Sequence, residues 1–135
     1  MFRPLELSDY YVYYHLINQF RETDFSYNQF SNLLRMQHIN IWVVLVDNKI
    51  VGCGTILYEQ KLIHNYGIVA HIEDVVISNN HKNKNYGSLL MEFLMDKAKE
   101  KGCYKIILNC EPTLKPFYEK LGFINNGLQM SKYLT

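Results

Sequence analysis

The sequence has little of what marks secreted, fibrous or membrane-spanning proteins. Three cysteines, three prolines and seven glycines in 135 residues exclude a disulfide framework, a collagen-like repeat and a low-complexity linker. Cys53, Cys103 and Cys110 are an odd number without C-x-x-C spacing, which favours a reducing compartment and predicts a cytoplasmic location. The first residues lack the layout of a secretory signal, and no apolar run approaches the roughly 18 residues of a membrane span.

An excess of charge of one sign is also missing. Lys and Arg number 14 and Asp and Glu number 13, which gives a formal net charge of +1. This balance produces no bulk attraction to nucleic acid or to an anionic membrane, so no nucleic-acid partner is expected. The five histidines have no metal-ligand spacing with each other or with the cysteines, and no metal is expected.

Apolar and aromatic residues, by contrast, are plentiful. Hydrophobic residues make up 48% and aromatic residues 14% of the sequence, which excludes a disordered chain. A chain of this length can bury about two-thirds of its unfolded surface and corresponds to one domain. We therefore expect a single globular domain over residues 1–135.

Periodicity and turn residues predict alternating strands and helices. Ser8-Asp9 is a plausible N-cap pair, Ser26 and Gln29 form a capping-box pattern, Asp47–Lys49 is a turn, and Gly102 ends an amphipathic helix. The predicted strands are Phe2–Leu5, Ile41–Val46, Ile50–Tyr58, Ile68–Ser78, Tyr104–Cys110 and Leu128–Leu134, and the predicted helices are Tyr10–Phe20, Ser26–Gln37, Ser88–Lys101 and Lys115–Leu121. This order is typical of an α/β (α+β) fold with helices on both faces of one sheet.

A polar turn, Lys82–Ser88, precedes the longest amphipathic helix. A helix start presents unpaired N–H groups and a partial positive charge, which together attract phosphate groups. Lys82 and Lys84 add cations, Gly87 permits close backbone approach, and Asn85 tolerates a left-handed conformation. From these residues alone, a phosphate-binding turn and a solvated basic loop are equally good interpretations.

Several stretches resemble one group of enzymes. Lys82–Gly87 is similar to the acetyl-CoA motif of the GNAT superfamily of N-acetyltransferases, Gln/Arg-x-x-Gly-x-Gly/Ala, and Phe117–Phe123 follows at that superfamily's spacing. Within the superfamily the chain resembles the glucosamine 6-phosphate N-acetyltransferases through Arg3–Leu5, Glu22–Thr23, Glu59–His64, His71–Val76 and Gly102–Leu108. The resemblance implies transfer of the acetyl group of acetyl-CoA to the amine of D-glucosamine 6-phosphate, by direct attack in a ternary complex, towards UDP-N-acetylglucosamine.

The same resemblance implies a mixed, mostly antiparallel sheet that is splayed where acetyl-CoA binds. The strand of Val75 and Val76 would part from its neighbour, leaving backbone groups free for the pantetheine arm. Tyr118 would lie beside the thioester sulfur and protonate the leaving thiolate, although a tyrosine at the edge of the core is the alternative interpretation. The residues implied in acetyl-CoA binding are Val75, Val76, Lys82, Asn83, Lys84, Asn85, Tyr86, Gly87, Ser88, Leu114, Tyr118 and Lys120.

The acceptor site follows from the resemblance too. Lys61 and His64 would hold the phosphate, and Glu73 and Asn109 are implied as catalytic residues together with Tyr118. Strand alternation predicts that Glu73 and its neighbour Asp74 face opposite ways. The implied acceptor residues are Thr23, Lys61, His64, Glu73, Asp74, Tyr104, Lys105, Asn109, Lys132 and Tyr133. Because that family's site lies across an interface with a shared C-terminal strand, a homodimer is implied.

Some positions depart from the family's pattern. Lys82 and Asn85 replace the Gln/Arg and the first Gly of the phosphate turn, Leu114 replaces an Asn, and Tyr133 stands where relatives carry an Arg. Asn109 stands where relatives carry a carboxylate. An amide can accept a hydrogen bond from the substrate amine but cannot take its proton at neutral pH, so water or backbone carbonyls are expected to take it.

These departures leave two other functions open. One is acetylation of a different small amine or of a protein N-terminus on the same scaffold, and the other is acetyl-CoA binding without catalysis. A cysteine acyl-enzyme would be a different chemistry. Cys110 is the cysteine nearest to the implied site, but it lacks a catalytic partner at suitable spacing and is predicted to be a buried strand residue.

Overall fold

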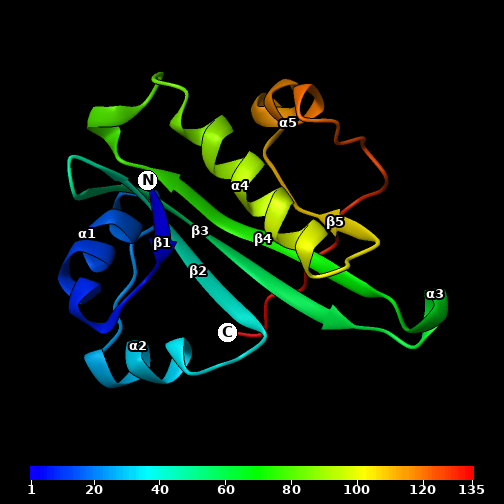
Figure 1. The fold of residues 1–135 in the computed structure, drawn as a ribbon, viewed down its shortest axis with the longest axis horizontal. Coiled ribbons are helices and arrows are strands. Elements are labelled where there is room, and N and C mark those ends of the chain that lie inside the picture. The colour runs from blue at the N-terminus through cyan, green and yellow to red at the C-terminus, as the bar shows by residue number, and fades with distance from the viewer.

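The core of the molecule is one five-stranded sheet whose strands lie in chain order. The computed structural model describes residues 1–135. Strands β1 (Phe2–Pro4), β2 (Ile39–Val46), β3 (Lys49–Gln60) and β4 (Ile68–Ile77) pair antiparallel, and β5 (Lys105–Ile107) pairs parallel with β4. This mixed, mostly antiparallel sheet confirms the predicted fold class (Figure 1).

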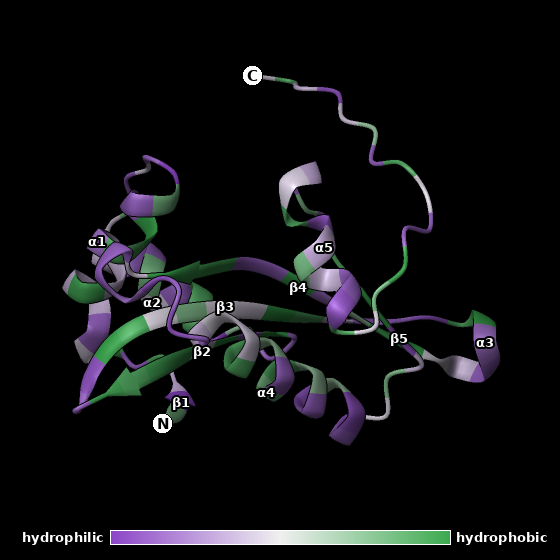
Figure 2. Cartoon of the chain, turned by 90° about the horizontal axis from the view of Figure 1, so that it is seen from above, coloured by the Kyte–Doolittle hydropathy of each residue, from purple (hydrophilic) through white to green (hydrophobic).

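Helices cover both faces of the sheet, and each face has its own core. On one face α1 (Tyr10–Phe20) and α2 (Tyr27–Leu34) pack over Ile41, Val43, Cys53 and Val76. On the other face α4 (Tyr86–Glu100) buries its apolar stripe, and Figure 2 shows α1 and α4 on opposite sides of the sheet. The residues of this second core are Val44, Val51, Ile56, Ala70, Ile72, Leu90, Met91, Leu94 and Ala98. The remaining helical elements are η1 (Leu7–Asp9), α3 (Ile63–Tyr66), η2 (Asn79–His81), η3 (Pro112–Leu114) and α5 (Lys115–Lys120).

Several element boundaries have local causes that the sequence predicts correctly. The Oγ of Ser26 accepts a hydrogen bond from the Gln29 amide at 3.1 Å, and the Gln29 side chain accepts one from the Ser26 amide at 2.9 Å, which is a complete capping box. Asp47 and Asn48 both have positive φ (51° and 62°), as the tight turn between β2 and β3 requires. Gly102, with φ of 84°, follows the end of α4.

Four expectations differ from the structure. Strand β5 is limited to three residues rather than Tyr104–Cys110, so Cys110 is exposed and lies outside the sheet. The turn α3 was not expected, and α2 ends at Leu34 rather than at Gln37. The predicted strand Leu128–Leu134 is absent, because the chain after Phe123 runs out from the body without a strand to pair with (Figure 2).

The first turn of α1 is tied to the N-terminal strand by an ion pair. Asp9 holds the N-cap position, but its carboxylate accepts from Arg3 at 2.7 and 3.1 Å and from the Glu6 amide at 2.8 Å instead of capping the helix. Burial alone would raise the pKa of Asp9. The hydrogen bonds from Arg3 and Glu6 and the Arg3 charge outweigh burial and hold that pKa below its usual value.

Replacing Asp9 by asparagine is therefore expected to destabilise the fold by about 1–2 kcal/mol at pH 7, since a charge-assisted bidentate pair at a partly solvated site is lost. A lowered native pKa stabilises the fold above the unfolded pKa of about 3.9, and this contribution disappears as the pH falls through the native value. Urea unfolding between pH 7 and pH 3 should thus show a smaller acid-induced loss of stability for the asparagine variant. An equal loss in both proteins would contradict the prediction.

Candidate active site

One edge of β4 is open over most of its length. The ladder between β4 and β5 joins only Val69, Ala70 and His71 to Lys105, Ile106 and Ile107. Beyond His71, β4 continues to Ile77 without a strand on this side, and β5 has already ended. Val75 and Val76 lie in this unpaired part. The splay that the resemblance implies is present, and it exposes backbone N–H and C=O groups that can bind an extended ligand.

A β-bulge interrupts β4 at the same place. Thr55 pairs with Glu73 and Cys53 pairs with Val76, so Asp74 and Val75 together lie opposite Gly54. Asp74 has a left-handed φ of 49°. Two strand residues opposite one break the normal alternation of side chains.

The bulge corrects one expectation about the two carboxylates. Glu73 follows Ile72, which is buried beneath α4, and therefore faces the α1 side of the sheet. Asp74 lies on that side as well, because the next residue, Val75, packs against the core on the α4 side and successive strand residues alternate. Burial raises the pKa of the Cys53 thiol to about 12, and the nearby Asp74 carboxylate contributes to that rise. The prediction that Glu73 and Asp74 face opposite ways is therefore wrong, and Cys53 is a protonated core thiol rather than a nucleophile.

The turn before α4 contains two left-handed residues. Asn83 and Asn85 both adopt left-handed conformations, with φ of 65° and 69°, and Asn85 is the residue that precedes the helix. The left-handed conformation expected for Asn85 is thus confirmed. The side chains of Lys82 and Lys84 are exposed on the same turn. The first N–H groups of α4, from Tyr86 to Ser88, have no acceptor within the helix and are free to bind an anion.

Tyr118 lies on α5 and packs against the core on the α4 side of the sheet, next to Phe117, whose ring lies near Gly87 as does the side chain of Ile77 at the end of β4. Its ring is half-buried against Phe117 and Phe123, at centroid distances of 4.9 and 6.0 Å, and its hydroxyl makes no hydrogen bond within the chain. Burial raises the pKa of Tyr118 above its ordinary value, and the nearby Cys110 adds to this effect. The hydroxyl is therefore protonated at neutral pH and available as a donor. Leu114, which precedes α5, and Lys120, which ends it, are both exposed.

Four predicted acceptor residues meet at the tip of the β3–β4 hairpin. The His64 ring stacks on the Tyr104 ring at a centroid distance of 3.9 Å and an angle of 15°. The Nζ of Lys105 lies 5.8 Å from the centre of the Tyr104 ring. The Nζ of Lys61 is 3.5 Å from a carboxylate oxygen of Glu59. His64 and Lys105 are exposed and Lys61 and Tyr104 are half-buried, and three of the four side chains carry nitrogen donors of the kind that bind phosphate.

The other predicted acceptor residues do not join this cluster within one chain. Thr23 is exposed in the connection between α1 and α2, Asn109 is exposed after β5, and Lys132 and Tyr133 lie in the exposed C-terminal tail. The hairpin tip is also far from the bulge. Ile68 and Asp74 are six residues apart on β4, which at a rise of about 3.3 Å per residue is roughly 20 Å. A single sugar ring cannot span that distance.

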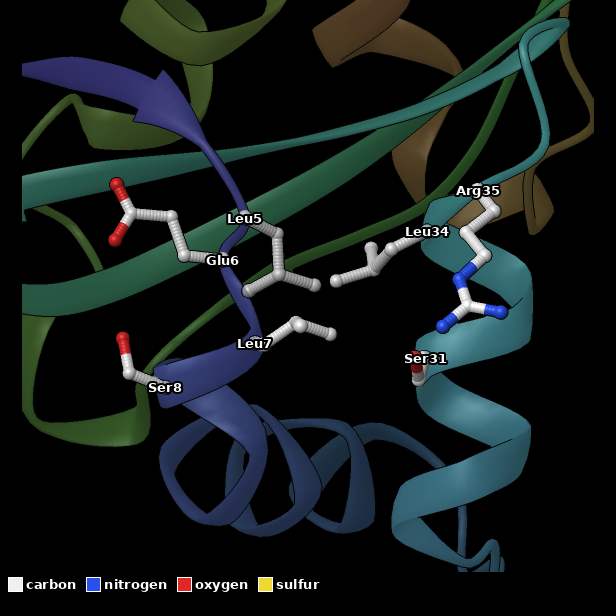
Figure 3. A pocket seen from close by; sticks show the side chains of 7 residues that line it. All are labelled: Leu5, Glu6, Leu7, Ser8, Ser31, Leu34 and Arg35. Carbon is white, nitrogen blue, oxygen red and sulfur yellow. The ribbon is translucent and has the colours of Figure 1, made fainter.

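A pocket elsewhere in the structure involves none of the predicted residues. It has a volume of about 510 Å³ and lies between η1 and α2, where Leu5, Leu7 and Leu34 point towards one another (Figure 3). Three or more His, Cys, Asp or Glu side chains are nowhere grouped as a metal site would need. No helix has both the length and the apolar character needed to cross a membrane.

Sequence reasoning missed two features of the hairpin tip. Glu59 accepts a hydrogen bond from His71 at 3.0 Å and also pairs with Lys61, and both contacts lower the pKa of Glu59, with His71 as the larger cause. Gln60 contacts the backbone of the turn that follows it. The sequence contains one indication of these contacts: Glu59 and Gln60 directly precede Lys61 in the chain and are therefore close to the Lys-x-x-His pattern of Lys61 and His64.

A splayed sheet with an open β4 edge, next to a basic turn that opens a long helix, defines an acetyltransferase of the GNAT class. The acetyltransferase (GNAT) family profile matches residues 3–123. A glucosamine 6-phosphate N-acetyltransferase from Dictyostelium discoideum is 39% identical over 98% of this chain and 90% of its own length. A glucosamine 6-phosphate N-acetyltransferase from Candida albicans is 34% identical over 96% of this chain and 92% of its own length.

A solved structure gives the same result. The crystal structure of glucosamine 6-phosphate N-acetyltransferase from Arabidopsis thaliana superposes with a TM-score of 0.92 at 35% identity, covering 100% of this chain and 98% of that one. The chain belongs to the acetyltransferase (GNAT) family, and within it to the glucosamine 6-phosphate N-acetyltransferases. The protein is therefore an acetyltransferase enzyme.

Proposed function

We propose that this protein transfers the acetyl group of acetyl-CoA to the amine of D-glucosamine 6-phosphate, giving N-acetylglucosamine 6-phosphate and CoA. The observation that carries the proposal is the open β4 edge between the bulge and the turn before α4. The half-buried Tyr118 on α5 packs on the same side of the sheet as α4. The relatives that match over nearly the whole chain are named for this reaction. Acetylation of another amine is the alternative, since Asn109 replaces a carboxylate.

Acetyl-CoA fits the residues that are present. Backbone groups of Val75 and Val76 would pair with the pantetheine arm, because an extended amide-bearing chain can hydrogen-bond to an open strand edge. The N–H groups from Asn83 to Ser88 would hold the pyrophosphate, with Lys82 and Lys84 adding charge. Asn85 replaces the family's first glycine, and it adopts the left-handed conformation that the turn needs. The two exposed lysines add positive charge that attracts the pyrophosphate.

The chemistry needs one nucleophile and one proton donor. The neutral amine attacks the thioester carbonyl, a C–N bond forms, and an N–H group of Val75 or Val76 stabilises the negative charge that develops on the oxygen. The C–S bond then breaks, and the thiolate receives a proton from Tyr118. The nitrogen, positively charged after the attack, loses a proton to water, while Asn109 accepts a hydrogen bond from it, and Tyr118 regains its proton from solvent. Glu73 and Asp74 place two negative charges beside the incoming amine.

We infer that the acceptor site is completed by a second copy of the chain. Lys61 and His64 lie in the turn before β4, and the start of β4 at Ile68 is roughly 20 Å from the bulge at Asp74, so they can reach only the phosphate of a sugar bound elsewhere. The C-terminal tail is exposed at Leu128, Met130 and Leu134, which is unusual for a stable monomer. The outer edge of β5 is free to accept a strand. A homodimer with shared tails would cover both the apolar tail residues and the free edge of β5. A cytoplasmic location is a separate prediction, made from composition alone.

Release of CoA is the direct test of this proposal. With acetyl-CoA saturating, kcat/KM for D-glucosamine 6-phosphate should exceed that for unphosphorylated D-glucosamine by about 100-fold, because two charge-assisted hydrogen bonds to phosphate contribute about 1.5 kcal/mol or more each. Equal turnover of both sugars would mean that the hairpin-tip residues do not bind the acceptor. Binding of acetyl-CoA without any turnover would favour a non-catalytic module.

A further inference from the structure

The turn at the tip of the β3–β4 hairpin has an unusual backbone. His64, Asn65 and Tyr66 are three consecutive non-glycine residues with left-handed conformations, at φ of 56°, 55° and 61°. Each such residue is unfavourable, because its Cβ crowds the following carbonyl oxygen. The turn persists only if contacts around it over-determine its shape. Those contacts also fix the position of His64 and of the neighbouring Lys61.

One side chain makes most of these contacts. The side-chain Nε2 of Gln60 lies 3.2 Å from the carbonyl oxygen of Lys61, 3.0 Å from that of Tyr66 and 3.2 Å from that of Gly67. A single NH₂ group therefore donates to the first and the last carbonyls of the turn and holds its two ends together. The Lys61 amide closes the same loop by donating to the Gly67 oxygen at 2.8 Å.

A second support lies under the turn. The Tyr104 ring stacks against His64 and lies so close to Gly67 that a Cβ at that position would be 2.6 Å from the ring. Glycine is thus required there. The Gln60 side chain thus holds the two ends of the turn, and the Tyr104 ring packs against the His64 ring that the turn carries.

We propose that Gln60 is a positioning residue for the acceptor's phosphate: its amide clamps the left-handed turn and so presents Lys61 and His64 to the phosphate monoester. The proposal rests on the proposed function, because it assigns Gln60 to the phosphate end of that substrate. Gln60 itself does not touch the substrate. Its contribution is pre-organisation, which lowers the cost of ordering the turn when the phosphate binds.

The test is Gln60→Met, which keeps the length of the side chain and removes its donors. We expect the KM for D-glucosamine 6-phosphate to rise about ten-fold with kcat within about two-fold, because binding is weakened and chemistry is not. The kcat/KM for unphosphorylated D-glucosamine should stay unchanged, since that sugar makes no use of the clamped residues. Amide hydrogen exchange at Tyr66 and Gly67 should become faster.

A matched control is Gln37→Met. Gln37 is exposed, makes no hydrogen bond and lies near Gln60 on the rim of the same shallow pocket, so this variant should match the wild type in every assay. Equal losses with both sugars would assign Gln60 a merely structural role and overturn the proposal. An unchanged KM for the phosphorylated sugar, or unchanged exchange at the turn, would also overturn it. If the wild-type enzyme showed no preference for the phosphorylated sugar, the proposed function would be refuted, and with it the role of Gln60 in phosphate binding.

Discussion

Replacing Tyr118 by phenylalanine is expected to lower kcat by about 100-fold or more, because general acid catalysis contributes roughly 10²–10⁴ in rate. The change removes one oxygen that makes no hydrogen bond within the chain, so the folded state loses no internal partner. The KM values of both substrates should change little, since the hydroxyl acts on the leaving thiolate rather than on the bound ground state. Steady-state measurement of CoA release, with each substrate varied in turn, gives both constants.

The pH profile provides a second readout for the same residue. Burial raises the pKa of Tyr118, so its protonated form, which is the donor, persists above the ordinary tyrosine value of about 10. Wild-type kcat should therefore show no loss from this group between about pH 7 and 9 and should fall only beyond its pKa, whereas the phenylalanine variant should lack that alkaline fall.

Two controls distinguish proton donation by Tyr118 from a general effect of losing a tyrosine hydroxyl and from attack by a cysteine. Tyr11→Phe, at an exposed position of α1, should leave kcat unchanged. Cys110→Ala should retain full activity with kinetics of the ternary-complex type. Ping-pong kinetics, or a Tyr118→Phe variant as active as the wild type, would contradict the mechanism and return Cys110 to consideration as a nucleophile.

The features that were predicted correctly from the sequence are those with local causes. The capping box of Ser26 and Gln29 satisfies backbone groups three residues apart, and the Asp47-Asn48 turn needs only residues that tolerate positive φ. The left-handed Asn85 follows from the same tolerance. Alternating strands and helices with apolar faces then lead to one sheet covered on both sides.

The features that were missed depend on contacts between distant parts of the chain. The bulge at Asp74 is defined by the register of β4 against β3 on either side of Gly54, and no property of Glu73 or Asp74 alone indicates it. The short length of β5 has a similar cause. Its residues after Ile107 are apolar enough for a strand, but β4 has already diverged from them. The left-handed turn of α3 depends on Gln60 and on the Tyr104 ring.

The C-terminal tail illustrates a different kind of limit. Its apolar residues predict a strand, and in the single chain that strand is absent, since it has nothing to pair with. A strand pattern without a partner in its own chain is evidence for a partner in another chain. The wrong secondary-structure prediction and the proposed homodimer therefore have one physical origin.

Removing residues 124–135 should accordingly abolish dimerisation and lower kcat/KM for D-glucosamine 6-phosphate by a factor on the order of 10² or more. The expected loss reflects two charge-assisted hydrogen bonds to the phosphate, at about 1.5–3 kcal/mol each, that the second copy can no longer supply. The truncation also removes Lys132 and Tyr133, two of the implied acceptor residues, so a variant that keeps both is needed to separate the two causes. Because these residues project from the body, the truncated monomer should still unfold cooperatively. Sedimentation at several protein concentrations and CoA release measure the two effects.

A finer variant keeps the tail and changes only one of its faces. In an extended strand Leu128 and Met130 lie on one face and Gln129 and Ser131 on the other. The double change Leu128→Glu/Met130→Glu should dissociate the dimer, because it places two charges where apolar side chains would be buried. Gln129→Glu/Ser131→Glu adds the same charge to the opposite face and should leave the dimer and the activity intact. If the apolar-face variant remained a dimer with normal kcat/KM, the tail would not form the interface, and Lys61 and His64 would require another route to the acceptor.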